Sequence, residues 1–412
     1  MKRVKFNIKK IFSLSILLTL VFFTLGIGKI NNYNGGEIYK NIYIEDINLN
    51  NMTREDAKSI VDKYYSVRPI KITYNEKEWS INPENINLSF NASEVIDEAY
   101  NYTRTDDIKY NLKRKLDLQL NNKKKFILRA SYDESKLSEE IHKICVEIDI
   151  PAKAASIIIK DSSEIITSES KEGREVDVVK LKELIYDTID RKKIIIIDLP
   201  VRVITPKITS EDVKSINSTL GQYSTSFNNS SARGNNIYVA GKGSSEIIVM
   251  PGEIYSFNKC TGARTWSKGY KTAKVIVGGK FVNGEGGGVC QVSTTIFNAT
   301  LLAGMEIQEV HNHTIPSKYA PRGRDAAVSY GYSDLKFKNP YSHPVYIKNI
   351  INNGAITSKV YGCNQDREKL YIRTEEKYEK DKINVKTYRI YLDEENNKIR
   401  EELISESKYN IK

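Results

Sequence analysis

The residues with the clearest chemical potential are one cysteine and two histidines that follow it in the chain. Cys290 closes the glycine-rich sequence GEGGGVC, and His311 and His313 stand in HNH further along. A cysteine thiolate is a nucleophile, a histidine can serve as its base, and a carboxylate such as Asp325 or Asp334 can orient the imidazole ring. This set predicts a thiol site for acyl transfer or peptide hydrolysis.

The stretch after the glycines has the periodicity of a helix. Apolar residues recur at a 3-4-3-4 spacing, and Gly304 can end the helix in left-handed geometry; they are Val289, Val292, Ile296, Ala299 and Ala303. Cys290 would then lie in the first turn, where unpaired N–H groups and the helix dipole favour a thiolate. The neighbouring Gly286, Gly287, Gly288 and Gln291 are candidate substrate-binding residues. Alternatively, Cys290 is a small buried residue that packs the helix onto the turn.

A metal site is a second hypothesis for the same residues. The sequence MEIQEVHNH alternates as a strand does, so His311 and His313 would point to one face of it. With Cys290 and Asp325 they could form a tetrahedral zinc set. Exposed histidines at a turn are the plainer interpretation, and we assign neither a metal nor another cofactor.

A third hypothesis is a docking module without catalysis. Arg322 and Arg324 could clamp a substrate carboxylate, and exposed aromatic rings could stack on sugars or peptides; the candidate rings are Trp266, Tyr270, Tyr319 and Tyr330. The alternatives are core packing for the aromatic residues and a solvated surface or a pair with Asp325 for the arginines.

Composition limits the class of protein. The 412 residues are 40% hydrophobic and 28% charged with a net charge of +11, which suits a folded protein of two or three domains. A basic protein can bind an anionic wall polymer, nucleic acid or lipid headgroups, and we expect no nucleic acid here. The four cysteines, Cys145, Cys260, Cys290 and Cys363, form no Cys-x-x-Cys pair, although Cys260 and Cys363 could form a disulfide.

The N-terminus has the pattern of a membrane anchor. A basic block precedes an uncharged run of 18 residues from Ile11 to Gly28, long enough to cross a bilayer as a helix. The basic residues before it place the N-terminus in the cytoplasm. We therefore expect a transmembrane anchor within residues 1–29 and a single-pass membrane protein whose bulk lies outside the cell.

Two folded regions are expected after the anchor. Residues 38–203 show a strand, a helix, a hairpin and a helix twice, which predicts an α+β module of two similar lobes with helices on an antiparallel sheet. Residues 209–363 are assigned to a second α+β domain, with antiparallel strands around the helix that begins at Cys290. Within this range, the polar stretch Ser224 to Asn236 is where the folded part of the domain is expected to start. Residues 364–412 form a charged, β-rich tail.

From Pro251 to Tyr361 the chain resembles the VanW family. The matching motifs are PGEIYSFN, TGARTWSKGYKTAKVIVGGK, GEGGGVCQVSTTIFNATLLAGMEI, HNHTIPSKYAPRGRDAAVSYGYSDLKFKNP and HPVYI. Residues 38–200, through IYIEDINLNNMTREDA and GREVDVVKLKELI, resemble the peptidoglycan-binding domains that precede this module. The resemblance implies a bacterial cell-envelope role and contact with wall glycan or stem peptide. The order Cys, His, Asp is also similar to papain-like and transglutaminase-like enzymes.

Together these observations predict a membrane-anchored extracytoplasmic protein that binds or modifies peptidoglycan. The modification would use the Cys290 thiol with His311 or His313 as base. The alternatives are wall binding or partner docking without catalysis, and a metal site built from the Cys, His and Asp residues.

Overall fold

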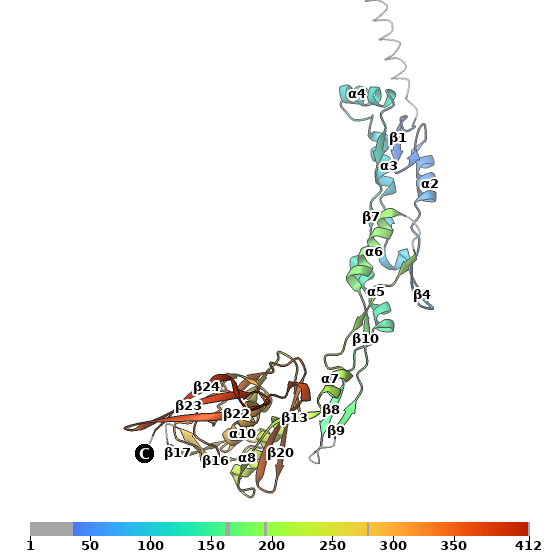
Figure 1. The fold of residues 1–412 in the computed structure, drawn as a ribbon. Helices are drawn as coiled ribbons and strands as arrows, with labels where there is room; N and C mark the ends of the chain where they lie inside the picture. Colours follow the sequence, from blue (N-terminus) through green and yellow to red (C-terminus); the bar gives the residue numbers. More distant parts are fainter. Residues whose placement is uncertain (1–35, 161–164, 193–195, 278–279, 411–412) are drawn as a thin grey trace, which may run out of the picture. The chain divides into compact units, whose positions relative to one another are not determined.

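The computed structural model describes residues 36–160, 165–192, 196–277 and 280–410. The chain forms two compact units. The first runs to Pro151 and continues with Gly173–Ile204, and the second comprises Ala152–Glu172 and Thr205–Lys412 (Figure 1).

The first unit contains two lobes, each with its own hydrophobic core. One lobe consists of the helices α2 (Arg54–Tyr64), α3 (Ala92–Asn101) and α4 (Ile108–Gln119), which share a hydrophobic core with a sheet of order β2-β1-β6. Its strands are β1 (Ile42–Ile44), β2 (Ile47–Asn48) and β6 (Lys124–Phe126). The N-cap of α2 is Thr53, whose side chain accepts the Asp56 N–H.

The other lobe is built around the helices α5 (Glu134–Ile148) and α6 (Val178–Arg191) and a sheet of order β11-β3-β4. The first of the two expected hairpins is observed as β3 (Ile70–Tyr74) and β4 (Lys77–Ile81), with β11 (Ile196–Asp198) parallel to β3. Short elements complete it: η1 (Pro83–Ile86) and the pair β10 (Gly173–Val176) with β12 (Val201–Ile204). The pair β5 (Ser89–Phe90) with β7 (Ala130–Ser131) serves both lobes, because Phe90 packs against the first core and Ala130 against the second.

The expectation of antiparallel sheets in this unit is wrong in part. Strand β1 pairs with β6 in parallel, as β3 does with β11, so both small sheets are mixed. In each case the partner strand comes from a segment far along the chain, after a helix, and such a crossover allows parallel pairing.

The second unit is organised around one buried helix, α10 (Val289–Leu302), which begins and ends near the expected residues. All five residues of the apolar stripe are buried, and Gly304 has a φ of 76° just after the helix. Helix α10 packs against strands β13 (Ser218–Ser226) and β21 (Ala355–Gly362), against helix α8 (Ala232–Gly243) and against β22 (Leu370–Glu379). The prediction of antiparallel strands around the helix that carries Cys290 is confirmed.

Antiparallel sheets surround this helix. A four-stranded sheet has the order β13-β21-β20-β14, with β14 (Ile247–Val249) and β20 (Val345–Asn352). A second has the order β15-β19-β18, with β15 (Ile254–Ser256), β18 (Glu306–Glu309) and β19 (Lys336–Lys338). The hairpin β16 (Thr272–Val277) and β17 (Lys280–Glu285) leads into the glycine turn, and α9 (Phe257–Thr261), η2 (Trp266–Lys268) and η3 (Asn364–Asp366) are short connecting helices.

The C-terminal sheet is formed by β22, β23 (Lys382–Leu392) and β24 (Lys398–Asn410). It is joined to the central helix by Arg389, which is 2% exposed and donates to the carbonyl of Leu301 in α10 and to that of Met305 just after it. The segment that we interpreted as a charged tail therefore packs on the core of the second unit.

The hairpin β8 (Ser156–Ile159) and β9 (Ile165–Ser168) belongs to the second unit, although it lies within the sequence of the first. Ile157 and Ile159 pack in a small core with Val213 of α7 (Ser210–Ser215) and with Tyr346. The polar stretch Ser224 to Asn236 was expected to begin the second domain. The structure instead places it well inside the second unit, where it includes the end of β13 and the start of α8. Three glycines in α8 hide its helical pattern in the sequence.

The prediction of an N-terminal transmembrane helix requires correction. Among the described residues, no helix is long and apolar enough to cross a membrane. The longest of them, α5, has 15 residues, fewer than the roughly 20 that a bilayer core requires. The run from Ile11 to Gly28 lies outside the described residues. The described part of the chain is a mixed α+β fold. The predicted location as a single-pass membrane protein is not supported.

Candidate active site

The glycine turn fixes where α10 begins. Gly288 is the N-cap residue with a φ of 114°, and Gly286 has a φ of 76°, values that favour glycine. A Cβ on Gly287 would lie 2.6 Å from the carbonyl oxygen of Lys274, so the turn also needs glycine for its close approach to β16. Cys290 consequently lies in the first helical turn.

The Cys290 thiol faces the backbone of Val328. Its sulfur lies 3.5 Å from both the amide nitrogen and the carbonyl oxygen of that residue. Burial of the thiol opposes its ionisation, but the hydrogen bond with His313, the Val328 amide and the charge of Arg264 outweigh it. The pKa of Cys290 is therefore below its ordinary value, as a nucleophilic cysteine requires.

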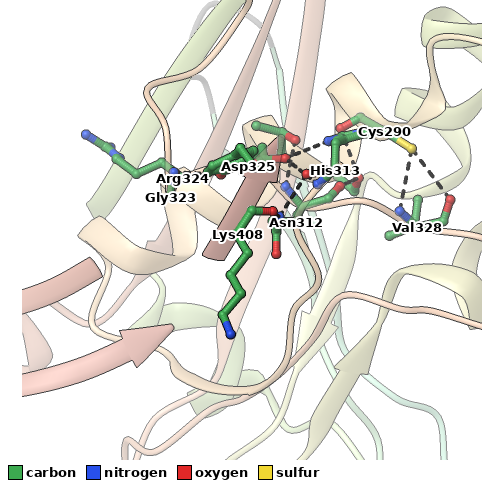
Figure 2. A network of polar contacts seen from close by, with 12 residues as sticks. Cys290, Asn312, His313, Gly323, Arg324, Asp325, Val328 and Lys408 are labelled. Carbon is green, nitrogen blue, oxygen red and sulfur yellow. Dashed lines mark hydrogen bonds and ion pairs between the residues drawn. The ribbon is translucent and has the colours of Figure 1, made fainter. Parts of the chain in front are cut away.

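His313 links the thiol to a buried carboxylate. Its Nδ1 lies 2.6 Å from Oδ2 of Asp325, and its backbone N–H donates to the same oxygen at 2.8 Å. Because a carboxylate only accepts, Nδ1 carries the proton and Nε2 is the nitrogen left for the thiol. Figure 2 shows His313 between Asp325 and Cys290.

The electrostatics of this pair favour an imidazolium. Burial opposes the charged ring, but the hydrogen bonds with Asp325 and Cys290 and their charges raise the pKa of His313 to about 10. The side chains of His313 and Asp325 are 10% and 1% exposed, so the contact is shielded from water. The lowered pKa of Cys290 and the raised pKa of His313 together favour a thiolate and imidazolium pair over a thiol and a neutral imidazole.

The other candidate histidine is elsewhere. Strand β18 ends at Glu309, before the HNH sequence, so the expectation that both rings share one strand face is wrong. The His311 ring pairs with Glu309 at 3.0 Å and is about half exposed. Asp334 accepts from Ser256 and from the Asn258 N–H, so of the two candidate aspartates it is Asp325 that contacts a candidate histidine ring.

The zinc hypothesis has no structural support. Within the ranges that the structure describes, no three His, Cys, Asp or Glu side chains come together as a metal-binding group. The four cysteines are also free, so Cys260 and Cys363 do not pair.

Gln291 is used inside the protein. It is 2% exposed, accepts from Arg233 at 2.8 Å, and donates to Thr225 at 3.0 Å and to the Ser226 carbonyl at 2.9 Å. These bonds hold α10 to α8 and β13. The side chain thus has its donors and acceptor satisfied by the fold.

The two candidate arginines also have partners within the chain. Arg324 donates to Asn298 at 2.7 Å and lies over the ring of Tyr223. Arg322 pairs with Glu376 at 2.8 Å and donates to the Tyr378 hydroxyl. Arg324 is therefore bound to α10 and Arg322 to the C-terminal sheet. The two guanidinium groups do not form a common clamp for a carboxylate.

The candidate aromatic residues differ in exposure. Trp266 is 68% exposed and Tyr330 is 54% exposed, whereas Tyr270 is buried. The guanidinium of Arg264 lies 5.8 Å from the centre of the Tyr330 ring, and its positive charge favours the thiolate form of Cys290. Arg264 therefore connects Tyr330 with the site. Tyr319 is half-buried, and burial together with the charges of Cys290 and Asp325 raises the pKa of its hydroxyl.

Sequence analysis missed two contributors. Arg264 has one terminal nitrogen, Nη1, buried without a partner, while its Nη2 donates to Asn258. Its only sequence signal was membership of the motif TGARTWSKGY. Tyr409 donates its hydroxyl to Oδ1 of Asp325 from 84 residues away, and no local pattern could have indicated it.

Comparisons with known proteins agree with the VanW resemblance and with part of the other, because the motif IYIEDINLNNMTREDA lies before the matched residues. Residues 232–361 match the family described as "VanW like protein", and residues 79–195 match the family described as "Putative peptidoglycan binding domain". The first match begins before Pro251, where the resemblance was drawn. No solved structure matches the chain.

Two curated proteins are similar to parts of the chain. "Uncharacterized protein YoaR" of Bacillus subtilis (strain 168) is 42% identical over 167 residues, which cover 40% of this chain and 55% of that protein. "Vancomycin B-type resistance protein VanW" of Enterococcus faecalis (strain ATCC 700802 / V583) is 27% identical over 135 residues, which cover 32% and 49%. The chain thus spans about half the length of these relatives. The chain thus has a region that matches the family "Putative peptidoglycan binding domain", followed by a VanW-like domain, and this combination indicates a cell-wall-associated protein.

Proposed function

We propose that the second unit is a thiol enzyme that performs acyl transfer or hydrolysis on peptide bonds of peptidoglycan. The observation that carries this proposal is the sequence of contacts from Cys290 through His313 to Asp325. The peptidoglycan-binding domain supports the class of substrate, because it would hold the enzyme on the polymer.

The contacts suit a two-step reaction. The Cys290 thiolate attacks the carbonyl carbon of the scissile bond, and His313 gives the proton of its Nε2 to the leaving amine as the C–N bond breaks. The product is a thioester on Cys290. Water or a second amine then attacks the thioester, His313 takes up the proton of this nucleophile, and the thiolate is released.

Other features would stabilise the charges of this reaction. The N-terminus of α10, the positive end of the helix dipole, lies beside the thiol, where a tetrahedral oxyanion would form. Asp325 holds the ring in the tautomer that leaves Nε2 for the thiol and the leaving group. The guanidinium of Arg264 adds a positive charge near the sulfur.

Selective alkylation tests the activated thiol. At about pH 6, iodoacetamide should modify Cys290, while Cys145 and Cys260 should stay unmodified because burial raises the pKa of both thiols. Peptide mapping by mass spectrometry identifies the modified residue. A Cys290 that reacts only after denaturation would contradict the proposal.

Trapping of an acyl-enzyme tests the reaction itself. Incubation with soluble peptidoglycan fragments should add the mass of an acyl group to Cys290, and Cys290→Ala should abolish the adduct. Cys260→Ala is the matched control and should keep it. An adduct that persists in Cys290→Ala would exclude Cys290 as the nucleophile.

A docking module without catalysis is the second candidate function. The exposed rings of Trp266 and Tyr330 favour it, because such rings can stack on sugars. In that case Cys290→Ser would retain both wall binding and cellular function, whereas Trp266→Ala would lose binding to purified cell walls.

A further inference from the structure

We propose that Tyr409, on the C-terminal strand β24, is a positioning residue for the thiol site. Its hydroxyl fixes the Asp325 carboxylate that orients the His313 ring. The inference rests on the proposed function, because it concerns the same site. Tyr409 lies beyond residues 232–361, so a segment outside the match to the VanW-like family would complete the site.

The two oxygens of Asp325 have separate tasks. Oδ2 accepts both the Nδ1 and the backbone N–H of His313, and Oδ1 accepts the Tyr409 hydroxyl. Asp325 is 2% exposed and Tyr409 is 0% exposed, so water does not compete for these bonds. Without the hydroxyl, Oδ1 would be a buried acceptor with a lost partner, and the carboxylate could rotate away from the ring.

The direction of the Tyr409 hydroxyl is itself fixed. The backbone N–H of Gly323 donates to its oxygen at 2.7 Å, so its own proton is left for Asp325. The carbonyl of Gly323 accepts from Thr387 of β23 at 2.8 Å. The C-terminal sheet therefore holds the loop that carries Asp325 at two adjacent points.

The same strand also holds the segment that carries His313. Asn312 donates to the carbonyl of Lys408 at 2.8 Å, and the N–H of Asn410 donates to the carbonyl of Thr314 at 2.9 Å. Figure 2 shows Lys408 beside Asn312. Strand β24 thus fixes the residues on both sides of His313. Tyr409, which lies between Lys408 and Asn410 on this strand, donates its hydroxyl to Asp325, the carboxylate that holds the His313 ring.

Several ionisable groups surround Asp325 and His313. They are Cys290 from α10, Tyr319 from the preceding loop, Tyr409 from β24, and Arg233 and Arg264, whose charges act on Tyr319 and Cys290 respectively. Burial, together with the charge of Asp325, raises the pKa of both tyrosines well above the ordinary value. Tyr409 consequently remains protonated, and a hydrogen-bond donor, throughout the pH range of an alkylation experiment.

The test compares Tyr409→Phe with Tyr391→Phe. Tyr391 is the matched control, since it is buried on β23 and donates to a different carboxylate, that of Glu402. Each variant and the wild type are alkylated with iodoacetamide between pH 5 and 9, with Cys290 followed by mass spectrometry and folding by thermal melts. In Tyr409→Phe we expect Cys290 alkylation about tenfold slower at pH 7 and a midpoint at higher pH, because the imidazolium is held less firmly. Tyr391→Phe should melt earlier with an unchanged profile.

A lower melting temperature in Tyr409→Phe with the wild-type alkylation profile would show a purely structural residue and overturn the inference. Thr387→Val is a second variant, which loosens the Gly323 loop with Tyr409 intact, and it should shift the profile in the same direction by less. If Tyr409→Phe does not fold, an unshifted profile in Thr387→Val overturns the inference. A wild-type Cys290 with an ordinary thiol profile would instead contradict the proposed function.

Discussion

At the scale of single residues, the structure separates two histidines that the sequence presents as equivalent. The ring of His313 meets a buried carboxylate and the thiol, whereas the ring of His311 meets Glu309 near the surface. The difference follows from the end of β18 at Glu309, after which the chain turns and the two side chains no longer share a face. One nitrogen of His313 is held by Asp325, and the other is available for chemistry.

Replacement of each histidine by alanine should therefore have different effects. His313→Ala removes the hydrogen bond and the charge that lower the pKa of Cys290, so the alkylation midpoint should rise above the wild-type value. Alkylation at pH 7 should slow by about tenfold or more. His311→Ala is the control, with alkylation expected at the wild-type rate. Equal effects of the two changes would contradict the assignment of His313.

The pH dependence of peptide cleavage should be bell-shaped. The acid limb reports ionisation of Cys290, whose pKa is lowered, so activity should already be high below the ordinary thiol pKa of about 8.5. The alkaline limb reports loss of the His313 proton, whose pKa is raised to about 10. Steady-state rates measured between pH 5 and 11 test both limbs. A rate that only begins to rise near pH 8.5 would show that the thiol is not activated.

At the scale of elements, the glycine turn decides where the thiol lies. Gly288 has a φ of 114°, and a Cβ there would lie 2.9 Å from Cγ of Arg233, so both its backbone and its surroundings demand glycine. The turn connects β17 directly to α10. A change that moves the N-terminus of α10 would therefore move Cys290 relative to His313, which belongs to a different segment.

Gly288→Ala should destabilise the protein and also slow alkylation of Cys290. The positive φ and the contact with Arg233 together should cost about 2–3 kcal/mol. Gly331→Ala is the matched control, because Gly331 has a φ of 83° with no atom within 4 Å of an added Cβ, and it should cost about 1 kcal/mol with alkylation unchanged. Urea unfolding and thiol kinetics provide the two measurements. Equal losses in the two variants would mean that only backbone strain matters.

At the scale of the whole molecule, the division into units does not follow the order of the sequence. The hairpin β8–β9 packs with the second unit, although the chain returns afterwards to the first unit through Gly173–Ile204. The family match at residues 79–195 thus includes a segment that helps to build the other core. The two units are consequently linked by the chain crossing between them more than once.

This division can be tested with two isoleucines. Ile159→Ala should destabilise the second unit by about 2–5 kcal/mol, since Ile159 is fully buried against Tyr346 and Val213. Hydrogen exchange should then speed up in β20 and β21 and stay unchanged in β3 and β4. Ile72→Ala, in the core of the first unit, should give the reverse pattern. Faster exchange in both units for either variant would show that they unfold together.

The sequence by itself determined the elements whose signals are local. The apolar stripe and the glycines defined α10 and placed Cys290 in its first turn, and the turn residues defined hairpins such as β3–β4. Motifs in the sequence also indicated the two regions that family models match, residues 79–195 and 232–361. The helix α8 was missed because glycine weakens the helical pattern, and its stability comes from packing.

Tertiary structure alone decided which residues meet at the thiol. Asp325, Arg264 and Tyr409 are brought to Cys290 and His313 by loops and by a C-terminal sheet that are distant in the chain. Such contacts depend on strand pairing and on burial, which no short window of sequence contains. The amino-acid sequence therefore indicated Cys290 and its possible partners, and the fold decided which of these partners lie beside it. The reason is that only the packed structure removes water and fixes the distances on which their pKa values depend.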